Sequence, residues 1–217
     1  MKFLITSLSF LLLFSSCKKN PSENFYESKD KRSFEDIWEA YKVQVKLKLK
    51  LEDVDFKFNP PANLKEVSQW EKVLGQKLTG ELLELYKIGN GQAEDGQTAF
   101  KGFTIMKIVN AARQWQMVDT KIAKIKVPDS IVGAVKEDIW NKKWIPFGTD
   151  PGGNLLCIDL DPEKGGFAGQ VIAVYFESGI REVIALSIKD YFSRAEAGLK
   201  SGALGFDAFG VGPIPVK

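Results

Sequence analysis

The stretch WIPFGTDPGGNLLCIDLDPEKGGFAGQVIAV, residues 144–174, decides the fold. It holds short apolar runs, and glycines and prolines separate these runs from one another. This is the pattern of successive β-strands. The turn DPGGN, residues 150–154, suits a hairpin, because proline presets its own φ and the glycines permit positive φ. The sequence therefore predicts strands over residues 144–150, 154–161, 169–177 and 181–187.

Helical patterns lie on both sides of this strand series. Apolar residues recur at helical spacing in residues 34–41, 64–75, 80–88, 107–125 and 187–202. Ser33 and Thr79 are predicted N-caps, and Gly75 is a predicted C-cap. Helices, then mostly antiparallel strands, then a closing helix indicate a single globular α+β domain.

Residues 42–51, KVQVKLKLKL, carry two conflicting signals. Strict alternation is a strand pattern, with every lysine on one face. Leucine and lysine also favour helix, and no turn residue separates this stretch from the helix before it. We predict that the helix continues to about residue 51. Its basic face is expected to be solvated, and contact with anionic lipid is the alternative.

The N-terminus has the pattern of a bacterial lipoprotein leader. Lys2 precedes an uncharged apolar run, and LFSSC, ending at Cys17, resembles a lipobox except for Phe14 in place of an aliphatic residue. We predict a signal peptide at residues 1–16, lipidation of Cys17 and a polar, flexible tether over residues 17–32. The lipid would hold the protein to a membrane on the extracytoplasmic side, in the cell envelope. An ordinary secretory signal is the alternative.

Charge and composition exclude several classes of function. The chain has 30 basic and 28 acidic residues and no histidine. A nearly balanced charge argues against nucleic-acid binding. The absence of histidine removes Ser-His-Asp and Cys-His catalysis and every histidine-ligated metal site. We therefore expect a non-enzymatic protein with no cofactor and no metal.

The carboxylates of the strand series are a candidate metal or catalytic site. Asp159 and Asp161 are two residues apart, so they lie on the same face of a strand. With Asp150 they are a conceivable calcium site or the centre of a calcium-dependent hydrolase, but calcium needs six to eight oxygen ligands. The more economical interpretation is a structural hairpin whose polar edge contacts a partner.

This polar edge is our candidate partner-binding rim. Phe167, in the loop DPEKGGFAGQ, is predicted to be exposed beside acidic side chains, a mixture that partner proteins use. The candidate residues are Asp150, Asn154, Asp159, Asp161, Glu163 and Phe167.

Several motifs together resemble one known family. FNPPA, WEKVLGQKLTGELLELYKIGNGQ and the stretch quoted first occur in this order, followed by an amphipathic helix. The set resembles the Smi/Knr cell-wall-assembly-regulator family of the SUKH superfamily, over residues 58–202. Thr79-Gly80 departs from the family pattern, which usually has a proline there. The resemblance implies a central sheet flanked by helices. Outside it, the residue pattern predicts a helical extension over residues 33–57, and the alternation of Gly, Phe and Pro predicts an irregular tail over residues 203–217.

The resemblance also implies a function, although it transfers fold more safely than function. Bacterial members are mostly viewed as immunity proteins that neutralise toxins, and fungal relatives regulate cell-wall synthesis. We expect a membrane-tethered protein-binding domain whose partner is a toxin. The alternative is a regulator or scaffold that binds a cell-wall enzyme or glycan.

Overall fold

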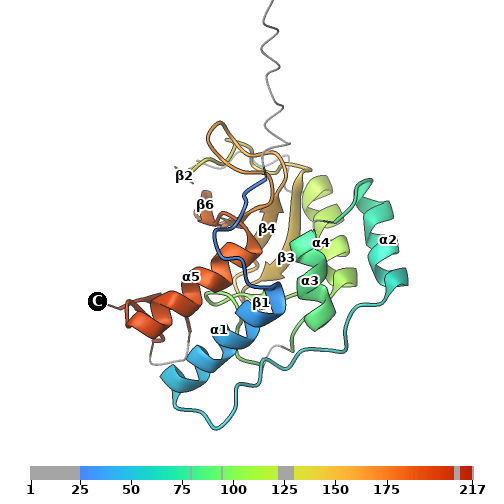
Figure 1. The fold of residues 1–217 in the computed structure, drawn as a ribbon. Coiled ribbons are helices and arrows are strands. Elements are labelled where there is room, and N and C mark those ends of the chain that lie inside the picture. Colours follow the sequence, from blue (N-terminus) through green and yellow to red (C-terminus); the bar gives the residue numbers. More distant parts are fainter. Residues whose placement is uncertain (1–24, 79, 94, 122–129, 208–210, 217) are drawn as a thin grey trace, which may run out of the picture.

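The computed structural model describes residues 25–78, 80–93, 95–121, 130–207 and 211–216 (Figure 1). The predicted lipidation site Cys17 and the predicted cap Thr79 lie outside these residues. Within them, no helix is long and apolar enough to span a membrane.

A six-stranded sheet forms the centre of the fold, in the order β1-β3-β4-β5-β6-β2. Its strands are β1 (Thr104–Ile105), β2 (Ser130–Val132), β3 (Trp144–Thr149), β4 (Leu155–Asp159), β5 (Gln170–Val174) and β6 (Ile180–Ala185). All neighbouring pairs are antiparallel except β2 and β6. The predicted α+β fold with a mostly antiparallel sheet is confirmed, whereas the parallel edge strand β2 was not predicted.

Strands β4 and β5 are buried at every position, so both faces of the central sheet are covered. Cys157 in β4 is fully buried, and burial raises the pKa of its thiol well above the usual value. The register between β3 and β4 shifts between Pro146 and Gly148. Gly148 suits this place, because a Cβ there would lie 3.2 Å from the Leu156 side chain.

Five helices are described, and Figure 1 shows them around the sheet. Helices α5 and α4 contact the sheet at β6 and β3, α1 packs on α5, and α2 packs on α4. Their bounds are α1 (Phe34–Leu49), α2 (Leu64–Leu74), α3 (Gly80–Ile88), α4 (Ile108–Lys121) and α5 (Ile188–Ser201).

The predicted first helix is confirmed, and it runs through most of the alternating stretch. Ser33 and Asp36 form a reciprocal capping box, and the helix ends where Lys50 adopts the left-handed conformation. The buried residues Trp38 and Tyr41 meet Phe192 of α5, with ring centroids 5.1 Å apart in each pair. This aromatic packing favours the helix over a strand, because helical spacing is what turns these residues toward one partner.

Two features differ from the sequence-based expectations. The tail is not wholly irregular, because β7 (Leu204–Gly205) pairs with β8 (Ile214–Pro215). On α2 the predicted packing face is only partly used: Trp70 is buried, but Leu64 is 87% and Val73 38% exposed. Leu64 is the first residue of its helix, and the apolar face of α2 is wider than its contact with the domain.

Candidate interaction surface

The predicted rim residues lie in two groups, at opposite ends of β4. Asp150 and Asn154 flank the hairpin turn, where Thr149 of β3 faces Leu155. Asp159 faces Trp144 at the other end of the same strand, and the remaining rim residues follow it. The structure therefore does not assemble the six residues into one surface.

The turn group is held together by its own hydrogen bonds. The backbone N–H and the side-chain amide of Asn154 donate to the two carboxylate oxygens of Asp150, at 2.9 and 2.8 Å. The side-chain oxygen of Asn154 accepts from the N–H of Phe176 at 3.2 Å. Gly153 has φ +77, the positive value predicted for a glycine of this turn. These contacts give Asp150 and Asn154 a structural role in closing the hairpin.

Asp159 does not lie on a surface, and this corrects its place in the predicted rim. Its side chain is fully buried and accepts hydrogen bonds from the Gln170 amide and the Asp161 N–H, each at 2.9 Å. Burial raises its pKa to about 6, although these hydrogen bonds oppose the shift. Gln170 also donates to the Ala134 carbonyl at 2.8 Å. Asp159 therefore holds neighbouring segments together and cannot touch a partner directly.

Asp161 is partly exposed and belongs to a polar cluster. Lys136 forms an ion pair with it at 2.7 Å, and Asn141 donates to its second oxygen at 3.0 Å. Burial acts to raise the pKa of Asp161, but the hydrogen bonds and charge of these neighbours outweigh it and lower the pKa. At the surface of this cluster the carboxylate of Asp161 is paired with Lys136 and is not an isolated negative charge.

The loop after β4 carries the other two rim residues. Glu163 is exposed. Phe167 is only partly exposed, which corrects the prediction of an exposed tip, because Tyr26 packs edge-on against its ring at a centroid distance of 5.4 Å. A segment far away in the sequence thus covers part of the predicted rim.

The conceivable calcium site is not assembled. Asp150 lies at the opposite end of β4 from Asp159 and Asp161. Among the residues that the structure describes, no group of three or more acidic or cysteine side chains could hold a metal ion. The ligand set on which the calcium hydrolase hypothesis depended is therefore wrong.

A groove between α2 and α4 was not predicted. It has a volume of about 260 Å³, and the buried Trp70 lines it together with the exposed Val73 and Val109. Glu66 and Arg113 also line it. The signal was present in the sequence, because both helices have broad apolar faces. Periodicity alone does not say which apolar residues another element will cover.

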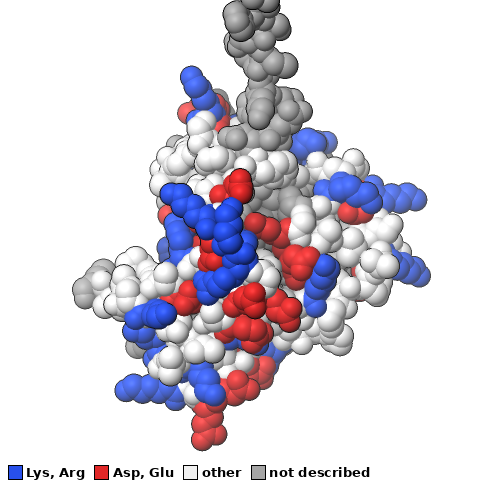
Figure 2. All heavy atoms as spheres, viewed as in Figure 1, with Lys and Arg blue, Asp and Glu red and all other residues white. Residues whose placement is uncertain are grey.

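Charges of both signs lie side by side on the face that carries α1 and α5. Figure 2 shows basic and acidic side chains next to one another there. Several of them are paired, such as Lys42 with Glu39 at 2.7 Å and Arg32 with Glu196 at 3.1 Å. On this face the charges form local ion pairs, and they do not create an electrostatic field of a single sign.

Comparison with known proteins assigns the fold to a family. No curated protein matches the chain. Residues 61–194 match the SMI1 / KNR4 family (SUKH-1), which is more than half of the 217 residues. The match contains the α2–α4 groove, all six strands of the central sheet and the first half of α5. The chain therefore belongs to the SMI1 / KNR4 family (SUKH-1).

Proposed function

We propose that this protein is a non-enzymatic, lipid-anchored immunity protein of the cell envelope, which binds and neutralises a protein toxin. The observation that carries the proposal is the family match over residues 61–194, since domains of this family are generally non-enzymatic and bind protein partners. The leader pattern that ends at Cys17 supports the place in the envelope.

The α2–α4 groove is the surface that best fits a protein partner. Val109 is 54% and Val73 38% exposed, and the buried Trp70 also lines the groove. Exposed apolar side chains grouped around an aromatic residue are typical of the centre of a protein interface. Glu66 and Arg113 suit a partner segment whose apolar centre is flanked by charges of both signs.

The experiment combines capture with a test of protection. The full chain is expressed in its own cells, crosslinked in the native envelope while competitor cells are present, and recovered for mass spectrometry. A strain that lacks the protein should be killed by the competitor, and the wild-type chain should restore survival and recover one foreign protein in stoichiometric amount.

A matched pair of variants tests the groove. Val109 in α4 and Val43 in α1 are 54% and 53% exposed, so Val109→Asp and Val43→Asp place the same charge at equally exposed helical sites. Val109→Asp should weaken capture about tenfold or more, as loss of a central interface contact does, and abolish protection. Val43→Asp should change neither.

Other outcomes decide against the proposal. If both variants lost capture and protection equally, the groove would not be the docking surface. Recovery of the cell's own wall enzymes only, with survival unaffected by deletion, would support the regulator or scaffold of cell-wall assembly instead.

A further inference from the structure

Residues 25–33, named here the strap, are part of the folded domain. The strap begins at one end of the molecule, where Phe25 forms a parallel bridge with Ala168 and Tyr26 packs on Phe167. The first turns of α3 and α5 lie at this end too, because Glu81 and Ile188 line the same cavity of about 460 Å³ as Phe25. We call this end the strap pole.

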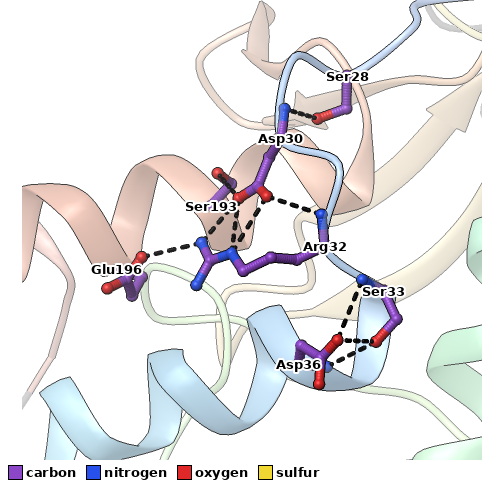
Figure 3. A network of polar contacts seen from close by, with 7 residues as sticks. All are labelled: Ser28, Asp30, Arg32, Ser33, Asp36, Ser193 and Glu196. Atoms are coloured by element: carbon purple, nitrogen blue, oxygen red, sulfur yellow. Dashed lines mark hydrogen bonds and ion pairs between the residues drawn. The ribbon is translucent and has the colours of Figure 1, made fainter.

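From the strap pole the chain crosses to α5 through a polar network (Figure 3). Arg32 pairs with Asp30 at 2.7 Å and with Glu196 at 3.1 Å, and the Ser193 hydroxyl donates to Asp30 at 2.7 Å. The hydrogen bond from Arg32 holds the pKa of Asp30 far below its usual range. The capping box at Ser33 then leads directly into α1. The part of the predicted tether that is described therefore lies on the domain.

Helices α1 and α5 both run away from the strap pole. Arg32, just before α1, contacts Glu196 of α5, whereas Lys48 in the last turn of α1 lies beside Gly202 at the end of α5. Sixteen residues make α1 about 24 Å long. The C-terminal end of α1 consequently lies away from the strap pole, as Figure 1 shows.

Covalent geometry limits how far the strap pole can be from a lipid on Cys17. Eight residue steps separate Cys17 from Phe25, and at roughly 3.5 Å per step they span at most about 28 Å. A domain of this size is about 40 Å across. The segment is too short for the domain to turn over and place its opposite end between the strap pole and the bilayer.

We infer that the strap pole is the membrane-facing surface of the protein and that its partner is the lipid headgroup layer. This inference rests on the proposed lipid anchor. Phe25 is 59% exposed there, and the exposed Lys77 lines the same cavity. Glu163 and Lys164 are exposed in the loop that leads to Ala168, the bridge partner of Phe25. An exposed aromatic ring among charged side chains suits the interface between headgroups and water. The C-terminal end of α1 points away from the membrane, and helices α2 and α4, which line the groove, lie at one side of the molecule (Figure 1).

Fluorescence quenching of the full lipidated chain tests the orientation. Lys164→Cys at the strap pole and Glu52→Cys beyond the end of α1 are each labelled with a fluorescent maleimide. Both positions are exposed, and the buried Cys157 is protected from the reagent. The proteins are reconstituted in vesicles of phosphatidylethanolamine and phosphatidylglycerol that contain a headgroup-level spin-labelled lipid. Quenching at position 164 should be several-fold stronger than at position 52.

A strap variant provides the control. Phe25→Ser, Tyr26→Ser, Asp30→Ala and Arg32→Ala together remove the side-chain contacts of the strap and leave only its backbone bridge to Ala168. Once this lone bridge opens, sixteen residue steps separate Cys17 from Ser33, and the free segment lengthens to about 56 Å. The difference between the two labels should largely disappear, while circular dichroism shows that the domain remains folded.

The outcomes separate this inference from the proposed function. Equal quenching at both positions in the wild-type chain, or stronger quenching at position 52, would overturn the orientation. If the chain does not float with the vesicles, the anchor is absent and the inference fails with it, whereas the capture experiment would still report whether the domain binds a toxin.

Discussion

The two ends of β4 carry similar residues and use them differently. At the turn, Asp150 is bonded by Asn154, four residues away, and every contact of the pair is local or with the adjacent strand end. At the other end, Asp159 is buried and bonded by Gln170, which also reaches Ala134. A carboxylate beside a turn can receive its hydrogen bonds from neighbouring residues. A buried carboxylate also depends on donors and on covering segments that lie farther along the chain.

The largest expected effect is on the pH dependence of the free energy of unfolding, and it comes from the buried carboxylate of Asp159. Burial raises the folded-state pKa of Asp159 from 3.8 to about 6, so between these values the folded protein binds more protons than the unfolded chain. The contribution of Asp159 is therefore fully present below about pH 4 and is lost as the pH rises through about 6. The loss amounts to about 3 kcal/mol.

Urea unfolding of the wild type and of Asp159→Asn across this pH range measures the effect. The free energy of unfolding of the wild type should fall relative to that of the variant as the pH rises. Parallel curves would show that Asp159 is not the buried titrating group. Asp161, whose pKa is lowered, should give the opposite sign when it is replaced by asparagine.

Truncation of the same residue should have the next largest effect. Asp159→Ala leaves the Asp161 N–H without its partner and removes one acceptor from Gln170. The free energy of unfolding should fall by about 2 kcal/mol near pH 4, where the contribution of Asp159 is present, which is the usual cost of a buried donor left unsatisfied. Asp161→Ala is the control and should cost about 0.5 kcal/mol, because its ion pair with Lys136 is solvated. Equal losses would contradict the contrast between the two carboxylates.

The smallest effect is expected at the turn. Asn154→Ala removes the acceptor of the Phe176 N–H and the donor to Asp150, and water can replace part of both. Thermal unfolding should show a loss of about 1 kcal/mol. Asn154→Asp keeps the acceptor but places a second carboxylate beside Asp150, so its loss should shrink as the pH is lowered. A loss in Asn154→Asp that does not change with pH would rule out this repulsion.

Features that depend on nearby residues could be predicted from the sequence. The capping box of Ser33 and Asp36 and the left-handed cap at Gly75 involve residues within one turn of a helix, and both are present. The hairpin at residues 150–154 is another such case. In each of them the backbone conformation follows from the residue types themselves.

Features that depend on distant segments could not be predicted. The alternation in β4 suggested one polar face, but coverage of both faces buries Asp159. The parallel pairing of β2 with β6, and the packing of Tyr26 on Phe167, join residues that no local pattern connects. The α2–α4 groove could not be predicted for the same reason. Val73 and Val109 are apolar, and yet no described element covers them.

The contact of the strap and α1 with α5 has a consequence for biosynthesis. Asp30 and Ser193 are 163 residues apart, and Trp38 meets Phe192 over a similar separation. The first described helix therefore lacks its partner α5 until almost the whole chain has been made, although Phe56 can pack on Trp38 earlier. Contacts of such high sequence separation form late and slowly. The docking of α1 on α5 is thus completed late, which suits the proposed export, because a secretion channel threads an extended polypeptide.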